Sequence, residues 1–65
     1  MNPIAVAEYN GNFSLDVNGN VYRVPEPVEI YNIDNLSQTA IIIRNNGIPT
    51  LVHLKQLDNI KYLPE

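Results

Sequence analysis

The sequence predicts a small all-β domain, and three short segments lead to that prediction. Two of them, "YNGNF" at 9–13 and "VNGNV" at 17–21, place Asn-Gly pairs eight residues apart, between runs that alternate apolar and polar side chains. Asn-Gly indicates a hairpin because both residues accept the positive φ of a type I′ turn. The third, "TAIIIR" at 39–44, is rich in β-branched residues, which favour strands. We therefore expect short antiparallel strands joined by tight turns.

Residues 4–24 are expected to form a three-stranded meander. If Asn10-Gly11 and Asn18-Gly19 are both two-residue loops, the registers at the two turns place the same side of the ribbon in the core. A slip of one residue at either turn would reverse the faces, so the agreement supports the prediction. The core side would consist of Ile4, Val6, Phe13, Leu15, Val17, Tyr22 and Val24.

The following strands are predicted from apolar runs and from the turn residues between them. Two prolines so close together cannot donate to a ladder, so residues 25–27 are expected to lie at an edge or corner. A polar connection is expected at 34–38, and an Asn-Gly turn lies within 45–49. The strands themselves are expected at 28–33, 39–44 and 50–54.

Leucine and isoleucine recur every third residue in the tail, which at first suggests a helix. The residues concerned are Leu51, Leu54, Leu57, Ile60 and Leu63. On an α-helix a three-residue step drifts by about 60°, so these side chains would spread around the circumference. We therefore expect one 3₁₀-type turn at 56–59 and a last strand at 60–63, with a C-terminal helix as the alternative.

This order of elements resembles an SH3-like barrel of about five or six short strands, with one 3₁₀ turn near the C-terminus. The resemblance covers roughly residues 20–63 and rests on strand order and spacing. It implies a sheet that closes on itself, which would remove exposed strand edges. The "ALYDY" segment typical of peptide-binding SH3 domains is absent, so no proline-rich ligand is implied. A β-meander followed by a C-terminal helix is the alternative fold.

Composition predicts one compact domain spanning residues 1–65. The chain is 45% hydrophobic, which is enough for a core and too much for a disordered tail. It has no cysteine, so disulfide bridges and thiolate metal sites are excluded. The N-terminal segment lacks a basic region followed by a long apolar run, and the expected protein is therefore soluble and cytoplasmic, without a membrane role.

The charge balance argues against nucleic acid as the main partner. The formal net charge is −3, and ten asparagines make the surface polar rather than charged. Proteins that hold phosphate backbones cluster their basic residues, whereas here they are scattered. The four basic residues are Arg23, Arg44, Lys55 and Lys61.

Catalytic chemistry is not expected either. His53 is the only histidine, and a general base or metal ligand needs companions. In an extended segment His53 would point away from Val52 and Leu54, towards solvent. Glycosidase-type chemistry needs two carboxylates at a fixed separation across a pocket, and a chain of 65 residues is too short to enclose such a pocket around any two of its seven carboxylates. We expect a protein that is not an enzyme and that uses neither a cofactor nor a metal.

Two segments indicate contact with another protein. Three successive isoleucines at 41–43 suggest that both faces of their strand are covered, either within the chain or by a partner. Between residues 25 and 35 carboxylates and a tyrosine occur without any basic residue, which suits a basic protein partner. The candidate contact residues are Tyr9, Glu26, Glu29, Tyr31, Asp34 and Ile42.

The function expected from the sequence is that of a small non-enzymatic protein-binding module. It would act as an accessory subunit, an assembly factor, or a modulator or inhibitor of a larger complex, and homodimerisation through the strand around Ile42 is a secondary expectation. The alternative is a small β-barrel that binds nucleic acid, with Tyr22, Arg23, Arg44 and Lys61 as the residues to inspect.

Overall fold

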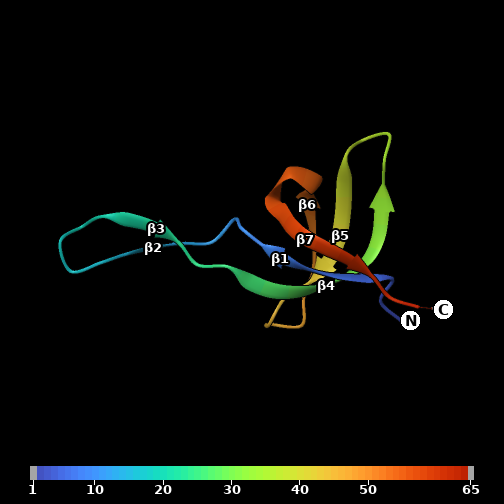
Figure 1. The fold of residues 1–65 in the computed structure, drawn as a ribbon, viewed down its shortest axis with the longest axis horizontal. Helices are drawn as coiled ribbons and strands as arrows, with labels where there is room; N and C mark the ends of the chain where they lie inside the picture. The colour runs from blue at the N-terminus through green and yellow to red at the C-terminus, as the bar shows by residue number, and fades with distance from the viewer. Residues whose placement is uncertain (1, 65) are drawn as a thin grey trace.

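Seven strands and one 3₁₀ helix make up the chain in the computed structural model, which describes residues 2–64 (Figure 1). Five strands form an antiparallel sheet in the order β6-β5-β4-β1-β7, and β2 pairs with β3 in a separate ribbon. The elements are β1 (Ala5–Tyr9), β2 (Phe13–Leu15), β3 (Val21–Arg23), β4 (Glu26–Asp34), β5 (Thr39–Ile43), β6 (Pro49–His53), η1 (Leu54–Gln56) and β7 (Leu57–Tyr62).

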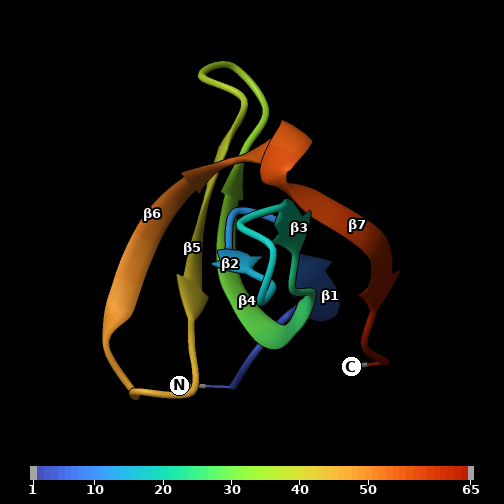
Figure 2. The same ribbon diagram turned by 90° about the vertical axis from the view of Figure 1, so that its left-hand side faces the viewer.

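The five-stranded sheet curves around a small core. Figure 2 shows β6 and β7 on opposite sides of the body, with η1 leading from one to the other. In the described residues β6 and β7 do not pair, so the sheet is all-β and antiparallel but not closed into a barrel. The buried side chains come from every strand of this sheet: Ala5, Ala7, Tyr9, Val28, Ile30, Ala40, Ile42, Val52 and Leu57.

The predicted three-stranded meander over residues 4–24 is wrong. Strand β1 pairs with β4 and β7 rather than with β2, and its buried face carries Ala5, Ala7 and Tyr9. Val6, expected in the core, lies on the opposite face. Both faces of β1 are apolar at their N-terminal end, so alternation alone could not distinguish them, and the choice of neighbouring strands decides which face is buried.

The turn at Asn18-Gly19 is also longer by one residue than predicted. The strand pairs Phe13–Arg23 and Leu15–Val21 are followed by a hydrogen bond from the Asp16 N–H to the Asn20 carbonyl, at 3.0 Å. The loop therefore consists of residues 17–19, of which only Gly19 has a positive φ, of 82°. This is the arrangement of a type I turn followed by a left-handed glycine. The Asp16 carboxylate accepts the N–H groups of Asn18 and Asn20, at 2.8 and 2.9 Å, which stabilises the longer loop.

The expected core side of the ribbon lies in solvent, because β2 and β3 form a ribbon separate from the five-stranded sheet. Phe13, Leu15, Tyr22 and Val24 are all exposed, and Val17 at the tip of the loop is fully exposed. Ile4, the remaining member of that side apart from Val6, is exposed as well.

The second half of the chain agrees with the prediction. The isoleucine strand is β5, the hairpin after it contains Gly47 with a φ of 75°, and β6 follows. The tail consists of a 3₁₀ turn and a last strand, so the C-terminal helix is excluded within residues 50–64. The turn lies at Leu54–Gln56 rather than at 56–59, and the strand accordingly begins at Leu57 rather than at residue 60. Strand β4 begins two residues earlier than expected and includes Pro27. There the proline is tolerated because pairing with β5 reaches only Glu29, so β4 has β1 as its single neighbour at Pro27.

We expect the two glycines of the Asn-Gly-Asn repeats to differ in their effect on stability. A Cβ at Gly11 would collide with the ring of buried Tyr9, whereas one at Gly19 meets no atom and is disfavoured only by its φ. Gly11→Val should therefore lower the free energy of global unfolding by about 1–3 kcal/mol. Gly19→Val should leave the body stable and disorder the adjoining turn, since the left-handed conformation costs a side chain about 1–2 kcal/mol. Urea unfolding and amide hydrogen exchange would measure both effects, and equal global losses would contradict this expectation.

Candidate interaction surfaces

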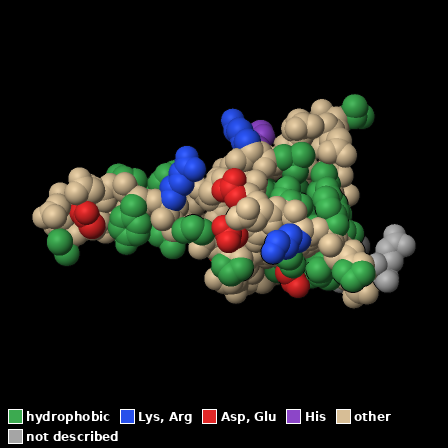
Figure 3. All heavy atoms as spheres, in the orientation of Figure 1, with side chains coloured by type: hydrophobic (Ala, Val, Ile, Leu, Met, Phe, Trp, Pro, Cys, Tyr) green, Lys and Arg blue, Asp and Glu red, His purple; other side chains and the backbone are tan. Residues whose placement is uncertain are grey.

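The β2–β3 ribbon projects from the body as an arm, which we define as residues 12–24 (Figure 1). Neither strand pairs with the five-stranded sheet, and two-stranded ribbons alone are marginally stable in water. The arm nevertheless bears a large share of the exposed apolar side chains, visible along it in Figure 3. Of the large hydrophobic residues exposed within residues 2–64, those on the arm are Phe13, Leu15, Val17, Val21, Tyr22 and Val24.

The two faces of the arm differ. Cross-strand partners share a face, so Phe13, Arg23, Leu15 and Val21 lie together on one side. The guanidinium of Arg23 lies 6.0 Å from the centre of the Phe13 ring, a cation–π contact on this face. The other face carries the pair formed by Ser14 and Tyr22. The first face is thus an apolar strip with one positive charge at the end next to the body.

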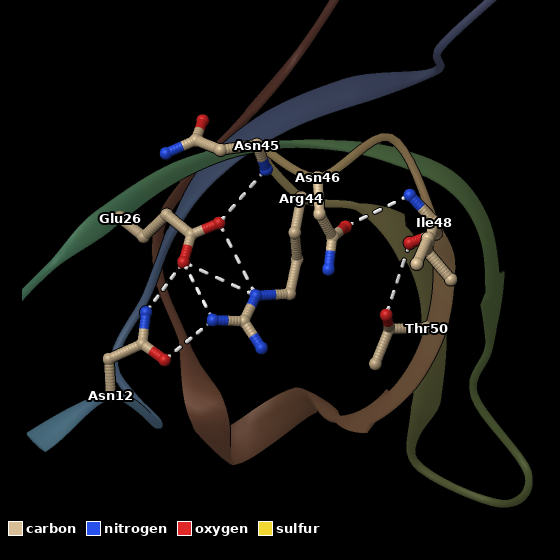
Figure 4. A network of polar contacts seen from close by, with 7 residues as sticks. All are labelled: Asn12, Glu26, Arg44, Asn45, Asn46, Ile48 and Thr50. Atoms are coloured by element: carbon tan, nitrogen blue, oxygen red, sulfur yellow. Dashed lines mark hydrogen bonds and ion pairs between the residues drawn. The ribbon is translucent and has the colours of Figure 1, made fainter.

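A polar network at the root of the arm fixes its connection to the body (Figure 4). Arg44, just after β5, forms an ion pair with Glu26 at 2.9 Å and donates a hydrogen bond to the Asn12 side-chain oxygen at 2.6 Å. Asn12 in turn donates to Glu26 at 2.5 Å, and the Asn45 N–H donates to the same carboxylate at 3.2 Å. The Arg44 guanidinium also stacks 4.9 Å from the centre of the Tyr9 ring. The Glu26 carboxylate therefore joins the start of β4 to the root of the arm at Asn12 and to the end of β5 at Arg44 and Asn45.

The network lowers the pKa of Glu26 from 4.5 to about 2. The Arg44 hydrogen bonds are the main cause, and those from the Asn45 N–H and the Asn12 side chain add to it, while burial opposes it. Glu26 is almost wholly buried, and the carboxylate and guanidinium thus satisfy each other out of contact with most of the solvent. This arrangement is structural, because it leaves neither group free to act on a ligand.

Acid should destabilise the fold through Glu26. Because its folded pKa lies below its unfolded value, the stabilisation is complete above about pH 4.5 and is lost as the pH falls towards 2. We expect a loss of about 2 kcal/mol over this range, after allowance for the partial exposure of Arg44. Urea unfolding at a series of pH values would measure it. Glu26→Gln should remove this part of the pH dependence, whereas Glu29→Gln should not, and an unchanged slope in Glu26→Gln would contradict the assignment.

A second apolar surface lies on the outer side of β4, β5 and β6. Two cross-strand rows run over it, one formed by Glu29, Ile43 and Pro49 and the other by Asn32, Ile41 and Leu51. Tyr31 lines a shallow hollow together with Ile41, Ile43 and Pro49. Leu51 is about two-thirds exposed, an unusual exposure for an apolar residue in the middle of a strand. We define the outer patch as Tyr31, Ile41, Ile43, Pro49 and Leu51.

The contact residues expected from the sequence do not form one surface, and three of them need correction. Ile42 lies in the core because its side chain is on the inner face of β5, between the outward-facing Ile41 and Ile43. Tyr9 lies in the core because it shares the inner face of β1 with Ala5 and Ala7. Glu26 is buried beneath Arg44. A surface built on these three side chains is not available in this structure, and the homodimer expected through Ile42 has no exposed side chain at that position.

The other three candidates are at the surface but are separated. Asp34 accepts the N–H groups of Leu36 and Ser37 in the turn after β4, which is a structural role. Tyr31 donates to the Glu29 carboxylate at 3.1 Å. Burial, followed by this hydrogen bond and the charge of Glu29, raises the pKa of Tyr31. Only Glu29 and Tyr31 therefore belong to a common surface, at the margin of the outer patch.

The sequence analysis missed the arm and the role of Arg44. One indication of the arm was present, because its apolar residues are flanked by asparagines and by Pro25, which lies between β3 and β4. For Arg44 no local pattern exists, since its partners lie 18 and 32 positions away in the chain. His53 is exposed at the end of β6, as expected.

Within residues 2–64 no three histidine, cysteine or acidic side chains are grouped so that they could hold a metal ion. Over the same residues, the helical content includes nothing of the length and apolar character that a membrane crossing requires. The arm and the outer patch are thus the two features of the described surface that call for an occupant. No family model, no curated protein and no solved structure matches the chain.

Proposed function

We propose that the protein is a small, non-enzymatic protein-binding module and that the arm is its contact element. The observation behind this proposal is the set of exposed apolar side chains on a ribbon whose two strands do not pair with the five-stranded sheet. Exposed apolar clusters of this kind are typical of protein–protein interfaces, where aromatic residues supply much of the contact area. An accessory subunit, an assembly factor and a modulator of a larger complex all fit such a surface.

We also propose that the fold is an open variant of the SH3-like barrel. In support of this, the second half of the succession that suggested the resemblance is present: the isoleucine strand β5, a glycine-containing hairpin, β6, a 3₁₀ turn and β7. The meander that stood before them in that succession is replaced by β1, the arm and β4. The arm then occupies the long connection between the first two strands of the barrel. On this proposal the body acts as a rigid base from which the arm is presented.

Nucleic acid remains the less favoured partner. Of the residues considered for it, Arg44 is engaged by Glu26, and Tyr22 lies on the opposite face of the arm from Arg23. A strand-binding groove needs aromatic and basic groups that converge on one surface, and these do not. The acidic net charge adds to the argument for a protein partner.

A photo-crosslinking experiment tests the proposal. A photoreactive amino acid replaces Leu15 on the arm or, as a control, Leu36, which is equally apolar and even more exposed but lies in the turn after β4. We expect the arm position to give a discrete protein adduct in the native host. Excess unmodified protein should compete the adduct away, and excess Leu15→Asp variant should not. Equal labelling at Leu36, or labelling insensitive to the competitor, would overturn the proposal.

A further inference from the structure

We propose that the occupant of the arm is a second copy of this chain, which receives the Phe13 face of the arm on its outer patch. This inference rests on the proposed function, because it assigns a partner to the same contact element. Reciprocal exchange would place each arm on the other subunit. Three observations support it: the match of side-chain rows, the match of charges, and the projection of the arm away from its own body.

The two surfaces have the same layout. On the arm, one row holds Arg23 and Phe13 and the next holds Val21 and Leu15. On the outer side of the body, one row runs through Glu29, Ile43 and Pro49, and the next through Asn32, Ile41 and Leu51. Successive rows are about 7 Å apart on the arm and on β5 and β6, where they come from every second residue, whereas β4 has a bulge between its two row residues. Face-to-face packing of two sheets, about 10 Å apart, would therefore set row against row.

In that alignment the charged ends of the rows meet. Arg23 ends the first arm row and Glu29 ends the first row on the body, so their opposite charges would be adjacent. Within residues 2–64 the only ion pair joins Arg44 and Glu26, and neither Arg23 nor Glu29 has an ionic partner there. Their complementarity would select the register and the direction in which the arm lies on the patch.

A closed dimer would bring more surface into contact than one arm alone provides. A specific interface buries roughly 800 Å² on each partner, which one short ribbon alone cannot supply. In a two-fold arrangement every subunit contributes both an arm and a patch, so the buried area is counted twice and no arm is left open for a third copy. The arm extends away from the body, as Figure 1 shows, so its own patch is not the surface that it meets.

Analytical ultracentrifugation of the purified protein from about 1 µM to about 1 mM tests this arrangement. We expect the wild-type chain to sediment at twice the chain mass, with Val21→Asp on the arm and Leu51→Asp on the patch each weakening dimerisation at least tenfold. Leu36→Asp and His53→Asp are the controls, because they add the same charge at exposed positions, the latter on β6 beyond the two rows. Circular dichroism would establish that each variant is folded.

Two further measurements separate this contact from general stickiness. Mixing Val21→Asp with Leu51→Asp should restore part of the dimer, because the intact arm of one variant can occupy the intact patch of the other. Arg23→Glu and Glu29→Arg should each weaken the dimer, and the double variant should regain it. A strictly monomeric wild type, a dimer insensitive to Leu51→Asp, or a double charge variant without recovery would overturn the inference. A monomer that still gives the competed adduct at Leu15 would overturn the second copy alone and leave the protein-binding arm in place.

Discussion

Replacing Arg44 by methionine is expected to destabilise the fold by about 3–5 kcal/mol, the largest effect of any single polar substitution in this chain. The change leaves the Glu26 carboxylate buried without its ionic partner, and an unpaired buried charge costs this much. It also removes the hydrogen bond to Asn12 and the contact with the Tyr9 ring. A domain of this size has a total stability of roughly 3–10 kcal/mol, so the variant should be largely unfolded or close to it. Urea unfolding followed by circular dichroism measures the loss.

Arg23→Met is the matched control for this prediction. Arg23 is exposed on the arm and contacts only the Phe13 ring, so its replacement should change the free energy of unfolding by less than about 1 kcal/mol. Adding Glu26→Leu to Arg44→Met should recover part of the stability, because an apolar pair replaces an isolated charge. If Arg44→Met is as stable as Arg23→Met, the network does not hold the arm and body together.

Ile42→Ala should cost about 2–5 kcal/mol, because Ile42 is one of the two largest fully buried side chains within residues 2–64. Ile42 is fully buried and packs within the core formed by all five strands, so truncation creates a cavity that neighbouring strands can fill only in part. Its neighbour Ile41 provides an unusually close control, since it has the same chemistry one residue earlier but lies on the outer face. Ile41→Ala should change stability by less than about 1 kcal/mol.

Thermal and urea unfolding of the two alanine variants would measure this difference. Equal losses would mean that β5 does not present alternate faces to core and solvent as described. Ile41→Ala has a second readout, because Ile41 belongs to the outer patch and its truncation should weaken dimerisation while leaving the monomer stable. Ile42→Asp, by contrast, would unfold the monomer and carries no information about a dimer.

The strands of the second half could be predicted because their signals are local. The β-branched run that became β5 is bounded on both sides by turn residues, and the buried and exposed residues of β6 alternate from Val52 outward. The tail could be resolved because a three-residue apolar repeat conflicts with the α-helical period. In each case neighbouring residues in the chain decide the conformation.

The arm and the core face of β1 could not be predicted in the same way. Asn10-Gly11 suggested a tight hairpin, yet the chain leaves β1 there for a separate ribbon, and Gly11 is required by the close approach of Tyr9. At Gly19 the hydrogen bonds from the loop to Asp16 favour three loop residues over two, and this single residue reverses the faces of the arm. Among the candidate contact residues, Tyr9 is buried because β1 pairs with β4 and β7 instead of with β2.

The sequence by itself determined an all-β chain, the positions of most strands and turns, the absence of cysteine chemistry and the acidic charge balance. Only the tertiary structure decided which strands are neighbours, and hence that Ala5, Ala7 and Ile42 are buried while Phe13, Leu15 and Leu51 are exposed. It also brought Arg44 to Glu26 and separated Glu26 from the other carboxylates. The physical reason is that strand conformation depends on nearby residues, whereas strand pairing and burial depend on contacts between segments far apart in the chain. Side chains of a strand alternate between its two faces, and no local sequence pattern marks which face its neighbours will bury.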